Sequence, residues 1–179
     1  IEDQGLLPMD PSGIVYNSMT REPIAGAKAT LIGPDGEAVP EEYLGSGQQN
    51  QVTSEDGFYR FDLDFNQAIA GKYLIRITPP VGYITETPSR VIEPAVDPDT
   101  EAYDPSSEAD PFKVVSFETA PAIGEDTTYY LSFELEAGDP DILNNHIPLD
   151  PNTEELLTIN KTVNKAKAAV GEFVSYKIQ

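Results

Sequence analysis

Short runs of alternating apolar and polar residues, each bounded by glycine or proline, constrain the fold of this chain more than any other feature. Two such runs, 58–63 and 72–77, lie on either side of a short loop. A period of two is typical of a strand with one buried face. The apolar residues that we expect to face the core are Tyr59, Phe61, Leu63, Tyr73, Ile75 and Ile77. We expect the two runs to pair as a hairpin that ends at the prolines and glycine of 79–82.

Four further segments carry the same kind of signal, namely 13–18, 27–32, 112–118 and 127–136. In the last of them, Leu131 and Phe133 fall on the face that we expect to be buried. No window shows the apolar repeat of an amphipathic helix, and 16 prolines and 13 glycines interrupt the chain. Many short strands divided by such turns indicate an all-β fold, most simply a β-sandwich.

The charge balance excludes several kinds of partner. The chain has 31 acidic and 11 basic residues, a formal net charge of -20. Such a surface repels nucleic-acid phosphates and anionic membranes. The absence of cysteine excludes disulfides, zinc-thiolate sites and cysteine nucleophiles. The sequence also contains no run of about 18 apolar residues, the length needed to cross a membrane. We therefore expect no nucleic-acid partner and no membrane insertion, and the composition suits an extracellular protein or one that collects cations.

The composition divides the chain into parts. Residues 1–12 resemble a lead-in, 13–138 hold the predicted sandwich, and 139–152 form a turn-rich segment that we interpret as a linker. Within the sandwich, residues 93–110 have acids and prolines but no base, which is typical of a long solvated loop. Residues 153–179 are basic toward their end and too few for a core of their own. We interpret them as the truncated start of a second β module.

Several motifs of residues 13–83 occur together in one known family. "GIVYNSMTREPIAGAKATLIGPDG" precedes "TSEDGFYRFDL" and "GKYLIRITPPVGY". This series resembles the B-type repeat of bacterial surface adhesins (Cna-B, or SD-repeat B-like) and the carboxypeptidase regulatory-like, prealbumin-like domains. The resemblance implies an Ig-like or prealbumin-like β-sandwich. It covers residues 13–83 well and 84–136 loosely.

The tail resembles the start of a different surface repeat. "LLTINKTVNKAKAAVGEFVSYKI" is similar to the opening of the DUF11 family. Two surface-repeat families in tandem imply that this chain is part of a long bacterial surface protein. We expect the tail strands to pair with the edge of the first sandwich or with a neighbouring molecule. The alternating residues are Leu157, Ile159, Thr162, Val163, Phe173, Val174, Tyr176 and Ile178.

Some Cna-B modules carry an isopeptide bond between a lysine on the first strand and an asparagine or aspartate on the last. Here the predicted first strand, 13–18, has no lysine, and the predicted last strand, 127–136, has no asparagine or aspartate. Lys28 falls on the second predicted strand, on the solvent side. We therefore expect no isopeptide bond.

SD-repeat B-like modules often bind calcium, which takes about six to eight oxygen ligands from carboxylates and carbonyls. Two acidic segments could supply such oxygens, one within the predicted loop and one at the predicted linker. The candidate ligands are Asp97, Asp99, Glu101, Asp139, Asp141 and Asn144. The alternative interpretation is that these side chains are simply solvated.

An enzymatic function is poorly supported. The single histidine, His146, falls in the predicted linker, and a serine-histidine-aspartate triad would have to use it. The chain also lacks tryptophan, which weakens a sugar-binding interpretation. We expect a non-catalytic spacer repeat of a bacterial cell-surface or secreted adhesion protein, with neighbouring domains as its partners and no required cofactor. The alternative is an adhesion module that binds calcium or a glycan.

Overall fold

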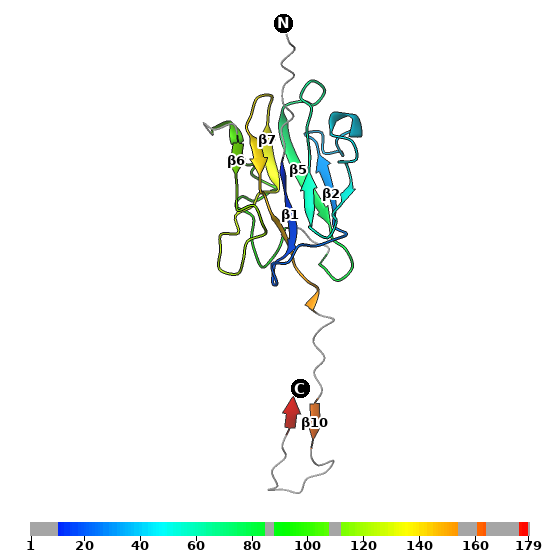
Figure 1. The fold of residues 1–179 in the computed structure, drawn as a ribbon, viewed down its shortest axis with the longest axis vertical. Helices are drawn as coiled ribbons and strands as arrows, with labels where there is room; N and C mark the ends of the chain where they lie inside the picture. Colours follow the sequence, from blue (N-terminus) through cyan, green and yellow to red (C-terminus); the bar gives the residue numbers. More distant parts are fainter. Residues whose placement is uncertain (1–10, 85–87, 108–111, 154–160, 164–175, 179) are drawn as a thin grey trace.

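The computed structural model describes residues 11–84, 88–107, 112–153, 161–163 and 176–178. Figure 1 shows a β domain built from short strands joined by long loops. The strands are β1 Ser12–Asn17, β2 Lys28–Ile32, β3 Gln51–Val52, β4 Phe58–Arg60, β5 Gly71–Thr78, β6 Phe112–Val114, β7 Ser132–Leu135, β8 Asp141–Leu143, β9 Ile147–Leu149, β10 Lys161–Val163 and β11 Tyr176–Ile178. Two single 3-10 turns, η1 Glu41–Tyr43 and η2 Pro105–Ser107, are the helical segments of the described residues. The fold is therefore all-β, as the alternating pattern predicts.

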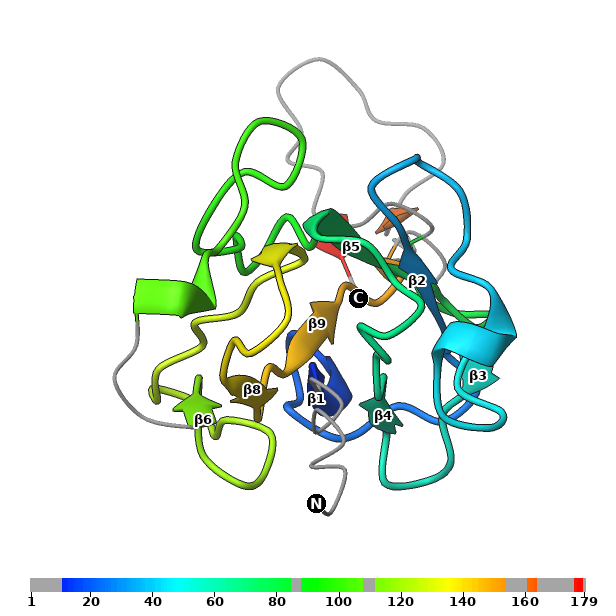
Figure 2. The same cartoon turned by 90° about the horizontal axis from the view of Figure 1, so that it is seen from above.

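The strands of the domain form two main sheets around one core. One sheet has the order β4-β1-β9 and the other β3-β2-β5-β7, while β6 and β8 form a separate parallel pair. Figure 2, seen along the domain, shows these strands surrounding a shared interior. The seven predicted core residues are at most 2% exposed: Tyr59, Phe61, Tyr73, Ile75, Ile77, Leu131 and Phe133.

The hairpin expected over 58–77 does not form. β4 pairs with β1, whereas β5 pairs with β2 and β7, so the two strands belong to different sheets. Phe61 and Leu63 are also fully buried, and they continue the alternation beyond β4 as the chain crosses between the layers. Alternation shows which face of a strand is buried, but two strands facing the same core from opposite layers give the same pattern.

The predicted linker is wrong, because residues 139–152 complete the domain. β8 pairs in parallel with β6, and β9 pairs in parallel with β1. Ile142, Ile147 and Leu149 join the hydrophobic core. The prolines and asparagines of this segment are typical of a linker, which explains the wrong prediction. The signal for a strand is the spacing of Ile147 and Leu149, which are two residues apart on either side of Pro148.

The acidic segment 93–110 is attached to the sheet over its described part. Tyr103 forms a parallel bridge with Phe133 of β7, and the backbone N–H of Tyr103 donates to the carbonyl oxygen of Ser132. The ring of Tyr103 also stacks on that of Tyr130, with centroids 4.3 Å apart. Residues 101–103 therefore lie along the outer edge of β7. Backbone pairing and ring packing hold this part of the loop.

The two tail strands pair with each other. β10 and β11 are antiparallel, with Thr162 opposite Lys177 and Val163 opposite Tyr176. The expectation that they pair with the edge of the first sandwich is therefore wrong for these strands, whereas pairing with a neighbouring molecule stays a prediction. Closing a local hairpin costs less chain entropy than recruiting a distant edge. The other residues of the predicted alternation, Leu157, Ile159, Phe173 and Val174, lie outside the described residues.

Candidate functional site

The first and last strands of the domain lie side by side in the same direction. Val15 is opposite Ile147, and Asn17 is opposite Leu149. The contact continues at both ends, because the N–H of Asn145 donates to the carbonyl of Ser12 (2.8 Å) and the N–H of Ser18 donates to that of Leu149 (3.0 Å). We call this pair of strands, residues 12–18 with 145–149, the terminal clamp.

Gly13 lets the two chains approach closely within the terminal clamp. A Cβ atom at this position would lie 2.1 Å from the carbonyl oxygen of Asn145. That distance is far inside any van der Waals contact, and the obstacle is backbone rather than a flexible side chain. Glycine is therefore required here for space, without which β1 could not lie against residue 145.

Asn145 joins three parts of the fold through a fully buried amide. Its Nδ2 donates to the Tyr59 hydroxyl (3.0 Å) and to the carbonyl of Tyr130 (2.8 Å), while its Oδ1 accepts the N–H of Tyr130 (2.8 Å). The Tyr59 hydroxyl in turn donates to the Asn145 carbonyl (2.6 Å). Burial raises the pKa of Tyr59, so this hydroxyl stays protonated and remains a donor. The side chain thus ties the terminal clamp to β4 and to the segment that precedes β7.

His146 is a structural residue of the clamp. Its Nδ1 accepts the N–H of Ile14 (3.0 Å), and its Nε2 lies 2.7 Å from the carbonyl oxygen of Phe117. These contacts assign the neutral tautomer that carries its proton on Nε2. Burial lowers the pKa of the imidazole, and the bond to the Phe117 carbonyl opposes that effect. Both nitrogens are occupied by backbone, so the ring is not available as a catalytic base.

The pKa of His146 predicts that the domain loses stability in weak acid. An imidazole whose folded pKa is lowered binds fewer protons when folded than when unfolded. Its contribution is fully present above the unfolded pKa of about 6.5 and decreases as the pH falls below that value. Thermal melts from pH 7.5 to 5.0 should therefore show a falling midpoint.

The variant His146→Asn is the matched control for this pH effect. An asparagine oxygen can still accept the N–H of Ile14, but the side chain does not titrate. We expect a lower midpoint at pH 7.5 and a flatter dependence between pH 7.5 and 5.0 than in the wild type. An equally steep dependence in this variant would assign the effect to other groups.

A buried carboxylate fixes the chain where it leaves the clamp. Asp150 is 6% exposed and accepts hydrogen bonds from the Ser89 hydroxyl, the N–H of Arg90 (2.6 Å) and the N–H of Val91 (3.3 Å). Burial opposes its ionisation, but these donors outweigh burial and lower its pKa. The backbone beside it is also paired, because the N–H of Ile84 donates to the Asp150 carbonyl. The exit of the domain is thus anchored to Ile84 and to residues 89–91.

The predicted calcium ligands of the acidic loop form a turn. Asp97 Oδ1 accepts the N–H of Asp99 (3.0 Å), and the Asp97 carbonyl accepts the N–H groups of Thr100 and Glu101. The Glu101 carbonyl accepts the Ser132 hydroxyl (2.7 Å). All three carboxylates are exposed. Local backbone donors and β7 therefore account for this geometry.

The other three predicted ligands lie around β8 and serve different contacts. Asp139 Oδ2 accepts the N–H of Glu136 (2.8 Å) in a turn, and Asn144 Nδ2 donates to the Ser116 carbonyl (3.3 Å). Asp141 is in β8 itself, opposite Phe112. Within the described residues, no three acidic or histidine side chains are grouped as a metal site requires. Calcium binding remains a prediction that a calorimetric titration with calcium, with and without EDTA, would test.

A pocket beside the Asp150 anchor offers little to a sugar. It has a volume of about 530 Å³ and lies between the segments at 88–94 and 97–98. Three prolines, two acids, a serine and an arginine line it, and none of these side chains is aromatic. Sugar rings in binding sites commonly stack on aromatic faces. The glycan alternative therefore gains no support from this pocket.

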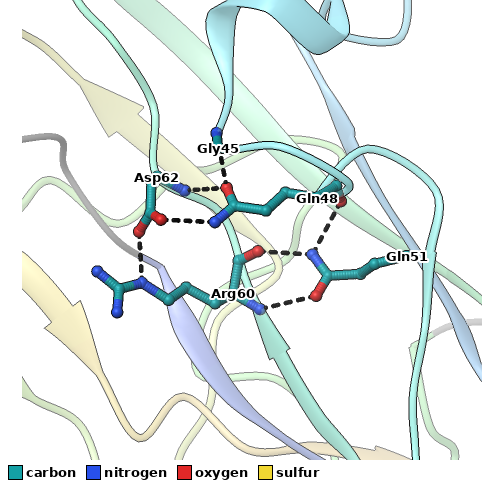
Figure 3. Close-up of polar contacts among 5 residues, drawn as sticks. All are labelled: Gly45, Gln48, Gln51, Arg60 and Asp62. Carbon is teal, nitrogen blue, oxygen red and sulfur yellow. Dashed lines mark hydrogen bonds and ion pairs between the residues drawn. The ribbon is translucent and has the colours of Figure 1, made fainter.

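Side-chain amides close the outer edge of β4. Figure 3 shows Gln51 lying against Arg60: its Nε2 donates to the Arg60 carbonyl (2.6 Å), and the Arg60 N–H donates to its Oε1 (3.1 Å). Gln48 Oε1 likewise accepts the N–H of Asp62 (2.5 Å) and that of Gly45 (3.0 Å). These amides occupy the positions that a neighbouring strand would take.

Gln49 pairs with β2 beyond the end of β3. Its Oε1 accepts the N–H of Leu31 (3.0 Å), and its Nε2 donates to the carbonyls of Leu31 (2.8 Å) and Val39 (2.6 Å). The segment 48–51 therefore joins the two sheets through its side chains, at β4 and at β2. Sequence patterns do not reveal such a role, because glutamine is equally common on solvated surfaces.

The isopeptide prediction assumed that 127–136 is the last strand of the domain. The last strand of the domain is β9 rather than 127–136, and its partner β1 has no lysine. Lys28 begins β2, where it is exposed. No lysine therefore lies on either strand of the terminal clamp.

Comparison with known proteins adds no further assignment. A scan against protein-family models finds no match, and a search of curated proteins also finds none. In the described part of the chain, no helix has the length and hydropathy needed to cross a bilayer. The terminal clamp is therefore the feature on which a functional argument can be built.

Proposed function

We propose that the β domain is a non-catalytic spacer that carries tension in a bacterial cell-surface or secreted adhesion protein. The observation that supports this most directly is the parallel pairing of β1 and β9, the strands through which the chain enters and leaves the domain. In a parallel pair, the start of one strand and the end of the other lie at opposite ends. Tension along the chain then slides the strands past each other, and the hydrogen bonds between them resist together.

Further contacts make the proposed spacer suitable for load. Asn145 and His146 fasten one strand of the clamp to β4, to Tyr130 and to Phe117. The Asp150 anchor holds the exit against Ile84 and residues 89–91. Displacing β9 therefore disturbs buried hydrogen bonds to several segments as well as those to β1, which raises the resistance to sliding.

The surface location rests on sequence. The resemblance of residues 13–83 to Cna-B repeats and of the tail to DUF11 repeats supports an Ig-like or prealbumin-like module within a multi-domain surface protein. The strong negative charge and the absence of cysteine are compatible with that setting. The partners of the spacer are then the neighbouring domains of its own chain. A distal domain would contact the host or cell-surface ligand.

Single-molecule pulling in two directions tests the proposal. The chain has no cysteine, so an introduced one gives a unique attachment point. With attachment at the first residue and at Thr153→Cys, tension slides β1 along β9. With attachment at Thr20→Cys and Thr153→Cys, both exposed and both just beyond the same end of the clamp, tension peels the strands apart one bond at a time.

We expect a clearly higher unfolding force in the sliding geometry than in the peeling geometry. The reason is that sliding loads the hydrogen bonds of the terminal clamp together. Both cysteine variants should show the same thermal midpoint, which controls for damage to the fold. Equal forces in the two directions would contradict a load-bearing role for the clamp.

A further inference from the structure

Three of the described edges of the two main sheets are closed in different ways. Gln48 and Gln51 cover β4, and residues 101–103 cover β7. In β9, Pro148 has no N–H to offer a further strand. Such devices prevent strands of other molecules from adding to a sheet.

β6 differs from these edges. Within the described strands it pairs only with β8. The N–H of Val115 points toward β8, because it donates to the Leu143 carbonyl (2.9 Å). In a strand, the N–H and carbonyl of one residue point to one side and those of the next residue point to the other. The N–H and carbonyl of Val114 therefore point away from β8. Figures 1 and 2 both place β6 at the outer margin of the domain.

The side chains of β6 add an apolar surface to this edge. Phe112 is 52% exposed and Val114 is 57% exposed, and they share a face because they are two residues apart. Lys113 points to the opposite face, where its Nζ lies 5.8 Å from the centre of the Tyr103 ring. The exposed face of β6 thus has apolar groups and no positive charge of its own.

We propose that the outer edge of β6, residues 112–114, binds an extended basic segment of another protein as an added strand. Backbone groups of Val114 would pair with the incoming strand, and Phe112 and Val114 would contact its apolar side chains. The charge of the chain selects the occupant. A net charge of -20 attracts a cationic segment and repels a second copy of the same chain. This binding does not depend on the spacer role.

A synthetic peptide of alternating lysine and valine, acetyl-KVKVKVK-amide, is the probe. Calorimetry should show binding at a one-to-one ratio that weakens as salt is added. In amide NMR spectra the largest shifts should fall on residues 112–115. The peptide acetyl-KPKPKPK-amide has the same charge but lacks the alternate N–H groups, so it should bind much more weakly. Equal binding of both peptides, or no binding, would overturn the proposal.

Two substitutions in β6 locate the site. Val114→Pro removes the outward N–H at a position where proline is tolerated on an edge strand, and it should weaken binding about tenfold. Val114→Asp should also weaken it, through loss of the apolar contact. Val52→Asp is the matched control, since Val52 is similarly exposed on β3, and it should leave the affinity unchanged. Thermal melts verify that each variant is folded.

The alternative occupant gives a different result. If β6 instead pairs with β6 of a second copy, sedimentation should show dimers that Val114→Pro abolishes, without binding of the lysine-valine peptide. That outcome would overturn the assignment of a basic partner. Peptide affinity that does not change in Val114→Pro would place the binding elsewhere and would overturn it equally.

Discussion

Replacing Phe61 with alanine should lower the free energy of unfolding by about 3–5 kcal/mol. The side chain is fully buried, and its ring lies 6.1 Å from that of Tyr59 within the shared core. Removing a fully buried ring from the core cluster leaves a cavity that the surrounding side chains close only in part. Urea titration followed by circular dichroism should show a lower midpoint with an unchanged slope.

Phe58→Ala is the matched control for Phe61→Ala. Phe58 is the same residue type only three positions away, but it is 49% exposed on the solvent side of β4. We expect its loss to change the free energy of unfolding by less than about 1 kcal/mol. Comparable losses in the two variants would mean that the alternation along residues 58–63 does not decide which residues support the core.

The alternating pattern predicts burial better than it predicts pairing. Tyr59 and Tyr73 were both expected to face inward, and both are buried. Their strands were expected to pair, yet they belong to opposite sheets. Whether a side chain is buried can be predicted from its own polarity and from the polarity of its neighbours in the sequence. The choice of partner strand depends on long connections, which carry no comparable periodic signal.

The terminal clamp could not be recognised from sequence for a related reason. Asn145, His146 and Asp150 are polar and follow a turn-rich segment, which is typical of exposed chain. In the fold their polar atoms are satisfied by backbone groups of distant residues, Tyr130, Ile14 and Arg90. Burial of a polar side chain depends on partners that only the tertiary structure supplies. The acidic residues predicted as ligands stand out by composition, but Asp97 and Asp139 accept backbone N–H groups in turns and Asp141 lies in β8.

Replacing Asn145 with alanine should destabilise the domain by about 2–4 kcal/mol, because it leaves buried polar groups without partners. The variant removes the acceptor for the Tyr130 N–H and the donors to the Tyr130 carbonyl and the Tyr59 hydroxyl. Water cannot easily replace a residue that is 0% exposed. Chemical denaturation measures the loss.

Asn144→Gly is the control for Asn145→Ala. Asn144 has a positive φ of 58°, which glycine adopts without strain, and its described side-chain bond is a 3.3 Å contact with the Ser116 carbonyl. We expect a loss below about 1 kcal/mol. The two neighbouring asparagines therefore compare a buried junction with a turn position. Similar losses of unfolding free energy in the two variants would show that the hydrogen bonds of the Asn145 amide do not hold the clamp.

A double-mutant cycle with Tyr59→Phe tests how the clamp is joined to β4. Asn145 Nδ2 donates to the Tyr59 hydroxyl, and either substitution removes this bond, so their effects should not be additive. The double variant should lose less stability than the sum of the single variants, with a coupling of about 1 kcal/mol or more. Additive losses would mean that the Asn145 side chain does not couple the exit strand to β4. In that case tension applied to β9 would not reach β4 through this side chain, and the clamp would depend on the β1–β9 hydrogen bonds, the His146 contacts and the bond from the Tyr59 hydroxyl to the Asn145 carbonyl.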